Sequence, residues 1–155
     1  MTASERRPAQ GFSLIELLTV MVLIAILATI ALPRLRSAID GAHVADILGD
    51  VRAVQVAYSQ YIMDNGSRTR NSGWGRVPSE LVPYLPDGFQ FSGDVAEYRW
   101  IRLRPKASPW GVEMGEIRVK PRADLRTVLV DKLARMSNQA MIVKKKNHVM
   151  FYMVP

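Results

Sequence analysis

The stretch Gly11–Leu35, "GFSLIELLTVMVLIAILATIALPRL", decides the fold of this 155-residue chain. Within it, the 21 residues of Phe12–Leu32 carry one charged side chain, Glu16. As a helix rising 1.5 Å per residue, they would span about 31 Å, enough to cross the hydrocarbon core of a bilayer. A soluble core helix rarely stays apolar on every face over five turns. We therefore expect this stretch to be a membrane-spanning helix.

Two other interpretations of this segment are a buried core helix and an ordinary cleaved secretory signal peptide. A signal peptide has an apolar stretch of about 7–15 residues followed by a cleavage site of small residues. Here the stretch is longer, contains a carboxylate, and runs into "LPRLRSAID" without an Ala-x-Ala site. Arginines precede the span at positions 6 and 7 and follow it at 34 and 36. The positive-inside rule therefore does not fix its orientation.

The composition excludes several classes of protein. With 48% hydrophobic and 23% charged residues, the chain is not disordered throughout. The absence of cysteine excludes a disulfide framework, thiolate metal sites and a cysteine nucleophile. The net charge of +7 is the sum of +1 in residues 1–11, +1 in 12–39, −4 in 40–98 and +9 in 99–155. The middle of the chain is thus acidic and its last third basic.

The apolar stretch and its flanks resemble the class III signal of type IV pilins and type II secretion pseudopilins. In that family a short basic leader ends in Gly, an aromatic residue follows, and a Glu lies four residues further on. Here the leader would be residues 1–11, ending at Gly11, and the mature chain would begin at Phe12. The signature carboxylate would be Glu16 and the helix-breaking proline Pro33. The resemblance implies cleavage after Gly11 by a prepilin peptidase and methylation of the new Phe12 amine.

The charge on Glu16 has a physical consequence apart from any family. A carboxylate in hydrocarbon is costly unless it is paired. Cleavage before Phe12 would create an α-amino group about 6 Å away along the helix axis. That ammonium group could pair with Glu16 in the same chain or in an axially shifted neighbour. The resemblance favours the neighbour, so that this pair would set the stagger between subunits.

Pro33 removes a helix hydrogen bond to the carbonyl of Thr29, and its ring clashes there. We therefore expect a kink or local unwinding near residues 28–33. In the family that the chain resembles, such melting helps subunits to pack into a filament. A plain end of the membrane span is the alternative.

Helical periodicity continues beyond the proline, so a single helix is predicted over about residues 13–63. Its second half is amphipathic and "DNG" at residues 64–66 is a strong stop signal. We expect a filament-core or membrane half at 12–33, an amphipathic half at 34–65 and a globular head at 66–155. The expected apolar face of the second half consists of Val44, Ile47, Leu48, Val51, Val54, Tyr58, Tyr61 and Ile62.

The remaining sequence predicts an α+β fold, in which the long N-terminal helix packs on a small antiparallel β-sheet. Residues 67–94 read as a long connection with a helical turn near 79–84. Strands are predicted at 97–104 and 116–120, a helix at 123–136, and a terminal hairpin at 141–154 that turns near 145–148. In the second strand, Ile117 and Val119 alternate with Glu116, Arg118 and Lys120, which places the two sets on opposite faces. The next helix should bury Leu125, Val128, Leu129, Leu133 and Met136.

The sequence contains no catalytic constellation, and we expect a structural protein rather than an enzyme. His43 and His148 lack the neighbours of a zinc site. No cofactor is expected. Asp87, Asp94 and Glu97 could supply oxygen ligands to Ca²⁺, which some pseudopilins bind, but their spacing is unlike that of an EF-hand loop.

Two groups of alternating basic residues lie in the C-terminal third. If their strands pair, the two groups would form one cationic patch near Trp100 and Trp110, able to contact DNA phosphates. A solvated face, or pairing with the acidic region of a neighbouring subunit, is the alternative. The two groups are Arg102, Arg104 and Lys106, and Arg118, Lys120 and Arg122.

The resemblance thus implies a pilin or pseudopilin, held by its helix in the bacterial inner membrane with its head outside the cytoplasm. From there it would pass into a type IV pilus or a type II secretion filament. Its partners would be homologous subunits, the prepilin peptidase, the inner-membrane assembly machinery and membrane lipid. A DNA-binding minor pilin acting in DNA uptake is the alternative function. A membrane-anchored enzyme is a third class.

Overall fold

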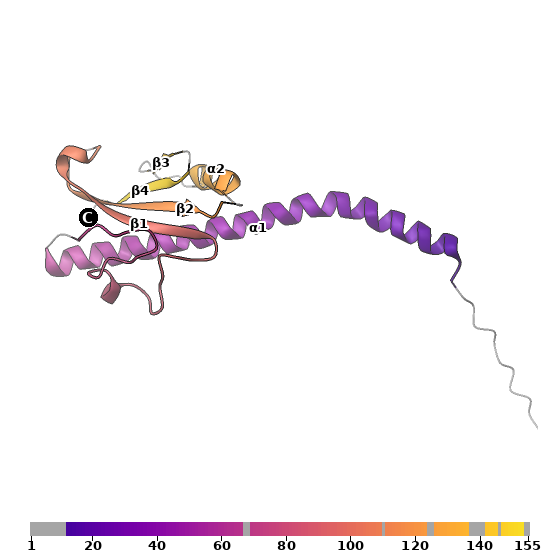
Figure 1. Cartoon of the computed structure of the whole chain (residues 1–155), viewed down its shortest axis with the longest axis horizontal. Coiled ribbons are helices and arrows are strands. Elements are labelled where there is room, and N and C mark those ends of the chain that lie inside the picture. Colours follow the sequence, from indigo (N-terminus) through magenta and orange to yellow (C-terminus); the bar gives the residue numbers. More distant parts are fainter. Residues whose placement is uncertain are drawn as a thin grey trace, which may run out of the picture. The chain divides into compact units, whose positions relative to one another are not determined.

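The computed structural model describes residues 12–66, 69–109, 111–123, 126–136, 142–145 and 147–153. It contains a long helix and a small head with a four-stranded antiparallel sheet, which confirms the predicted α+β fold (Figure 1). The chain divides into two compact units after Ala38. The expected leader, residues 1–11, lies outside the described residues.

Helix α1 runs from Leu14 to Asn65, close to the predicted range. Gly66 caps its C-terminal end: the Gly66 amide donates to the Ile62 carbonyl at 2.9 Å, and its φ of +56° gives the left-handed cap expected at "DNG". The backbone stays helical through Pro33. The local unwinding expected near residues 28–33 is therefore absent from this single chain, because a proline removes only one hydrogen bond of an otherwise complete ladder.

The second half of α1 packs on the head through the face that periodicity predicts. Leu48 and Ile62 are partly buried at the edge of this face, and Ala57 joins it. Its fully packed members are Val44, Ile47, Val51, Val54, Ala57, Tyr58 and Tyr61.

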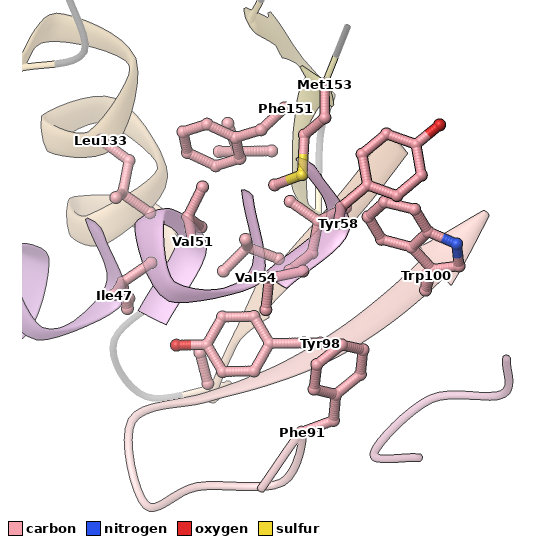
Figure 2. Packing of buried hydrophobic residues seen from close by; sticks show 14 of the residues in the cluster. Ile47, Val51, Val54, Tyr58, Phe91, Tyr98, Trp100, Leu133, Phe151 and Met153 are labelled. Carbon is pink, nitrogen blue, oxygen red and sulfur yellow. The ribbon is translucent and has the colours of Figure 1, made fainter. Parts of the chain in front are cut away.

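The sheet consists of β1 (Ala96–Leu103), β2 (Met114–Pro121), β3 (Ile142–Lys144) and β4 (Val149–Met153). They lie in the order β1-β2-β4-β3, and every pair is antiparallel. The predicted strands and terminal hairpin are confirmed, with the Lys145 amide donating to the His148 carbonyl across the turn at 2.9 Å. Alternate residues of β1, β2 and β4 face α1 and form the core with it, among them Tyr98, Trp100 and Phe151 (Figure 2).

Helix α2 (Arg126–Met136) adds Leu129, Val130 and Leu133 to this core. The prediction was wrong for Val128, which is 47% exposed. Val130 is buried instead, because the helix is rotated relative to the face that the spacing suggested. The side chains of Leu125 and Met136 lie outside the described residues.

The connection between α1 and β1 closes one edge of the sheet. The Ser72 amide donates to the Trp100 carbonyl at 3.0 Å, and the Gly75 amide to the Tyr98 carbonyl at 2.9 Å. The predicted helical turn is present as the short 3₁₀ helix η1 (Val82–Tyr84). A second 3₁₀ helix, η2 (Pro105–Ala107), lies in the connection between β1 and β2. The connection between α1 and β1, through Ser72 and Gly75, thereby pairs backbone groups of β1 that an open sheet edge would leave unpaired.

Candidate functional site

The apolar half of α1 is a large exposed hydrophobic surface. Phe12 is 83% exposed, Leu14 77% and Leu27 65%. The helix is long and apolar enough to cross a membrane, and none of its most apolar stretch is buried. Monomeric soluble proteins rarely expose so large an apolar surface. This half therefore needs lipid or other helices around it.

The hydroxyl groups of the two threonines in this half donate hydrogen bonds to backbone carbonyls of the same helix. Thr19 Oγ1 donates to the Ile15 carbonyl at 2.8 Å, and Thr29 Oγ1 donates to the Ile26 carbonyl at 2.6 Å. Such bonds lower the cost of placing a hydroxyl in an apolar environment. Of the described residues between Phe12 and Leu32, Glu16 alone is charged.

Glu16 lies in the first turn of α1 and bonds to the start of its own helix. The backbone amide of Ser13 donates to Glu16 Oε2 at 2.9 Å. Since α1 begins at Leu14, Ser13 is the N-cap and Glu16 the third helical residue, so "SLIE" supplies one half of a capping box. Sequence reasoning missed this bond, although the S-x-x-E pattern was visible. The carboxylate is thereby held toward the N-terminal end of the helix, where an anion is favoured.

The predicted processing and assembly residues occupy different positions relative to this turn. Gly11 lies outside the described residues, and Phe12 is the first residue that the structure describes. Glu16 lies one turn beyond Phe12, whereas Pro33 lies well inside the helix. The structure therefore keeps Glu16 within reach of the residue that would carry a new amino terminus. Cleavage itself remains a prediction.

The two groups of basic residues do not form one patch, which corrects the sequence prediction. In the β1–β2 register, Arg102 lies opposite Gly115, whereas Arg118 lies opposite Arg99. Directly opposed residues share a face, so Arg102 faces the side of α1 and Arg118 the other side of the sheet. Lys120 lies on the same face as Arg118, opposite Glu97. Alternation within each strand was predicted, but the register that separates the groups was not.

Most of these basic residues have acidic partners. Distances between charged atoms are 2.9 Å for Arg102–Glu113, 3.4 Å for Lys120–Glu97 and 4.0 Å for Arg122–Asp94, and Arg118 bonds Glu116.

The aromatic side chains near these residues are engaged in packing. Trp100 is fully buried, so it is unavailable to stack on a base, and Trp110 lies outside the described residues. Lys120 Nζ lies 5.6 Å from the ring centroid of Trp74. Four of the six basic residues are thus paired and the indole of Trp100 is buried, while binding to an anionic ligand stays a prediction.

Glu116, on the face opposite Ile117 and Val119, is only 2% exposed. It lies on the sheet face away from α1, together with Arg118, and the two side chains form an ion pair. A buried carboxylate needs such a partner because ionised groups are rarely buried alone. Strand alternation places a residue on a face without indicating what covers that face, so the burial of Glu116 had no signal in the sequence.

A carboxylate on α1 is held by a tyrosine of the sheet. The Tyr98 hydroxyl donates to Asp50 Oδ2 at 2.5 Å. Burial raises the pKa of Asp50, and the nearby Asp46 carboxylate also raises it, while the Tyr98 hydrogen bond opposes both effects. Burial and Asp50 raise the pKa of Tyr98 far above its usual value, so its hydroxyl stays protonated.

The suggested calcium ligands do not gather into a cluster. Across the described ranges of the chain, no three His, Asp or Glu side chains converge as metal ligands. Asp94 is paired with Arg122, and Glu97 with Lys120. Calcium binding by Asp87, Asp94 and Glu97 stays an untested prediction.

Comparison with known proteins adds two findings. The family model for the prokaryotic N-terminal methylation motif matches residues 6–32. The chain is 31% identical to the type II secretion system core protein G of Klebsiella michiganensis, over 68% of this chain and 71% of the relative. It is 30% identical to the protein of the same name from Dickeya chrysanthemi, over 70% and 67%. It is 39% identical to that of Pseudomonas aeruginosa over 39% of this chain, spanning 43% of the relative's length. No solved structure matches the chain.

Proposed function

This chain belongs to the type II secretion system core protein G family, and on that premise we propose that it is a structural subunit of a secretion pseudopilus. The observation that carries the proposal is the location of Glu16. Its carboxylate lies in the first turn of a helix whose large apolar side chains are exposed. When such helices leave lipid and pack on one another, a carboxylate at this position can pair with a cation of a neighbouring helix.

The proposed pathway begins with the chain anchored in the inner membrane by α1, with the head outside the cytoplasm. A prepilin peptidase cleaves after Gly11 and methylates the Phe12 amine. In the membrane, headgroups and the Ser13 amide shelter the Glu16 carboxylate. In the filament, apolar helices surround it, and the Phe12 ammonium group of a neighbouring subunit becomes its counter-charge. Glu16 thus selects the axial offset at which two helices fit.

Substitutions at Glu16 test this proposal. Removing one partner of a buried ion pair typically costs about 3–5 kcal/mol, because the other charge is stranded. We expect Glu16→Ala and Glu16→Gln to be inserted and cleaved normally but to enter filaments poorly. Glu16→Asp should be intermediate, because the shorter side chain misplaces the carboxylate.

The experiment expresses each variant in a strain with a type II secretion system, with mass spectrometry for processing and immunoblots of sheared filaments for incorporation. Glu97→Ala is the matched control, since it removes a carboxylate from the head. Wild-type incorporation of Glu16→Ala, alone and beside the wild-type subunit, would refute the pairing mechanism.

DNA uptake is the second function that the sequence suggested. It would require a continuous cationic surface, whereas the basic residues of the sheet lie on two faces and most are paired. We therefore favour the secretion filament. Duplex binding by the purified protein that weakens steeply with salt would restore the alternative.

A further inference from the structure

Two basic residues at the end of the sheet, unlike those described above, form no ion pair among the described residues. Arg104 directly follows β1, and Lys106 lies in η2, in the connection to β2. Both are exposed, and neither forms an ion pair within the residues that the structure describes. We call residues 104–107 the basic knuckle. Figure 1 draws it at the end of the sheet where β1 finishes.

Two carboxylates on α1 also lack a cation. Asp46 and Asp50 lie one helical turn apart, and neither has a basic partner within the described residues. Asp50 is half-buried, and the Tyr98 hydroxyl occupies only one of its oxygens. Burial and Asp46 raise its pKa, so a negative charge on Asp50 is less stable there than in water.

Most of the other described carboxylates from Asp40 onward have a basic partner. Asp40 pairs with Lys132 at 3.6 Å, and Glu80 with Arg70 at 3.6 Å. Among the described residues from Asp40 onward, Asp46, Asp50, Asp64 and Asp87 are the carboxylates without a cation. Asp46 and Asp50 are adjacent on one helix and one of them is partly desolvated, so a cation would stabilise them most.

The knuckle of the same molecule cannot supply that cation. Asp50 is fixed beside Tyr98, and Arg104 lies six residues further along the extended chain. At about 3.3 Å per residue, the separation is about 20 Å. Two surfaces of opposite charge that cannot meet within one chain can meet between two copies displaced along the strand direction.

We propose that the basic knuckle of one subunit binds the Asp46–Asp50 pair of a second copy of this chain. The spacing of the two pairs matches: carboxylates one helical turn apart are separated by about 5–6 Å. Positions two residues apart in extended or 3₁₀ chain span about 4–7 Å. This interface rests on the proposed function, because a filament supplies neighbours displaced along one direction.

Charge exchange tests the interface. Arg104→Glu and Lys106→Glu each place a carboxylate against the acidic pair, and we expect filament incorporation to fall about fivefold for each. Asp46→Lys should show a similar fall. Combining Asp46→Lys with Lys106→Glu should restore incorporation, because the charges are then exchanged. Lys145→Glu is the control, an equal charge reversal at another exposed lysine, and should leave incorporation unchanged.

Cross-linking measures the contact directly, since the chain contains no cysteine of its own. Filaments with Asp46→Cys and Lys106→Cys in one chain, treated with a short bismaleimide, should give a ladder of dimers and higher species. Asp46→Cys with Lys145→Cys should stay monomeric. This readout remains valid if a charge-reversed variant misfolds.

The outcomes separate the two proposals. Wild-type protein that never enters filaments refutes the proposed function and the interface with it. If the wild-type protein forms filaments but filaments of the chain with Asp46→Cys and Lys106→Cys give no cross-link, the interface alone is refuted. Loss of incorporation by Lys106→Glu that Asp46→Lys fails to restore means that the knuckle binds another partner, and also refutes the interface.

Discussion

Gly115 in β2 offers a direct test of the head's packing. A Cβ atom added there would lie 2.2 Å from Cη2 and 2.5 Å from Cζ2 of the Trp100 ring. Carbon atoms prefer separations of about 3.5–4.0 Å, so the ring or the strand would have to move. Gly115 is therefore required by the space that Trp100 fills.

The indole ring of Trp100 has little freedom to move away. It is fully buried, and its Nε1–H donates to Thr69 Oγ1 at 2.9 Å. Its other neighbour is Tyr58 of α1, whose ring centroid lies 4.8 Å away. Overpacking a well-filled core costs about 1–3 kcal/mol. We expect Gly115→Ala to lower the free energy of unfolding by about 2 kcal/mol, or the Tm by roughly 8 °C.

Gly49→Ala is the matched control for this prediction. Gly49 lies inside α1, and a Cβ atom added there would have nothing within 4 Å, so the same chemical change meets open space. Alanine is favoured over glycine in a helix interior by up to about 1 kcal/mol. Urea unfolding of the full chain in detergent, followed by tryptophan fluorescence, measures both variants. A Gly115→Ala protein within about 0.5 kcal/mol of wild type would refute this explanation of the core.

Two further predictions concern buried polar contacts of the head. Because burial raises the native pKa of Asp50 above its unfolded value, the contribution of Asp50 to stability should fall as pH rises from below 3.8 through the native pKa. Asp50→Asn lacks this titration, so the free energy of unfolding of the variant relative to wild type should rise with pH over the same range. A relative free energy that stays constant with pH would contradict the assignment. Thr69→Val should cost about 1–3 kcal/mol in urea unfolding, because it strands the buried indole N–H of Trp100. Thr69→Ser should retain most of the stability, and equal losses in both variants would argue against the hydrogen bond.

Much of the fold could be predicted because the spacing of apolar residues along the sequence indicates which face of a helix or strand is buried. The three- and four-residue spacing after Pro33 indicated the buried face of α1, and "DNG" indicated its end. The strands followed from alternation and turn residues. For α2 the same reasoning placed Val128 inside, because a short helix with apolar residues on two sides admits more than one rotation.

The charged surfaces could not be predicted because they depend on long-range pairing. The faces of Arg102 and Arg118 are set by the β1–β2 register, and the burial of Glu116 by what covers the outer face of the sheet. The Tyr98–Asp50 contact joins residues 48 positions apart and leaves no local signal. The hydrogen bond from the Ser13 amide to Glu16, in contrast, is local, so the pattern "SLIE" is enough to predict it.

The intact mass of the protein extracted from membranes tests the central claim most directly. The full chain is expressed with and without a prepilin peptidase, and a Gly11→Leu variant serves as the control for the cleavage site. We predict that the peptidase removes residues 1–11 and adds one methyl group to Phe12, and that the control keeps its full mass. An unchanged wild-type mass, or cleavage near residue 31, would contradict this prediction.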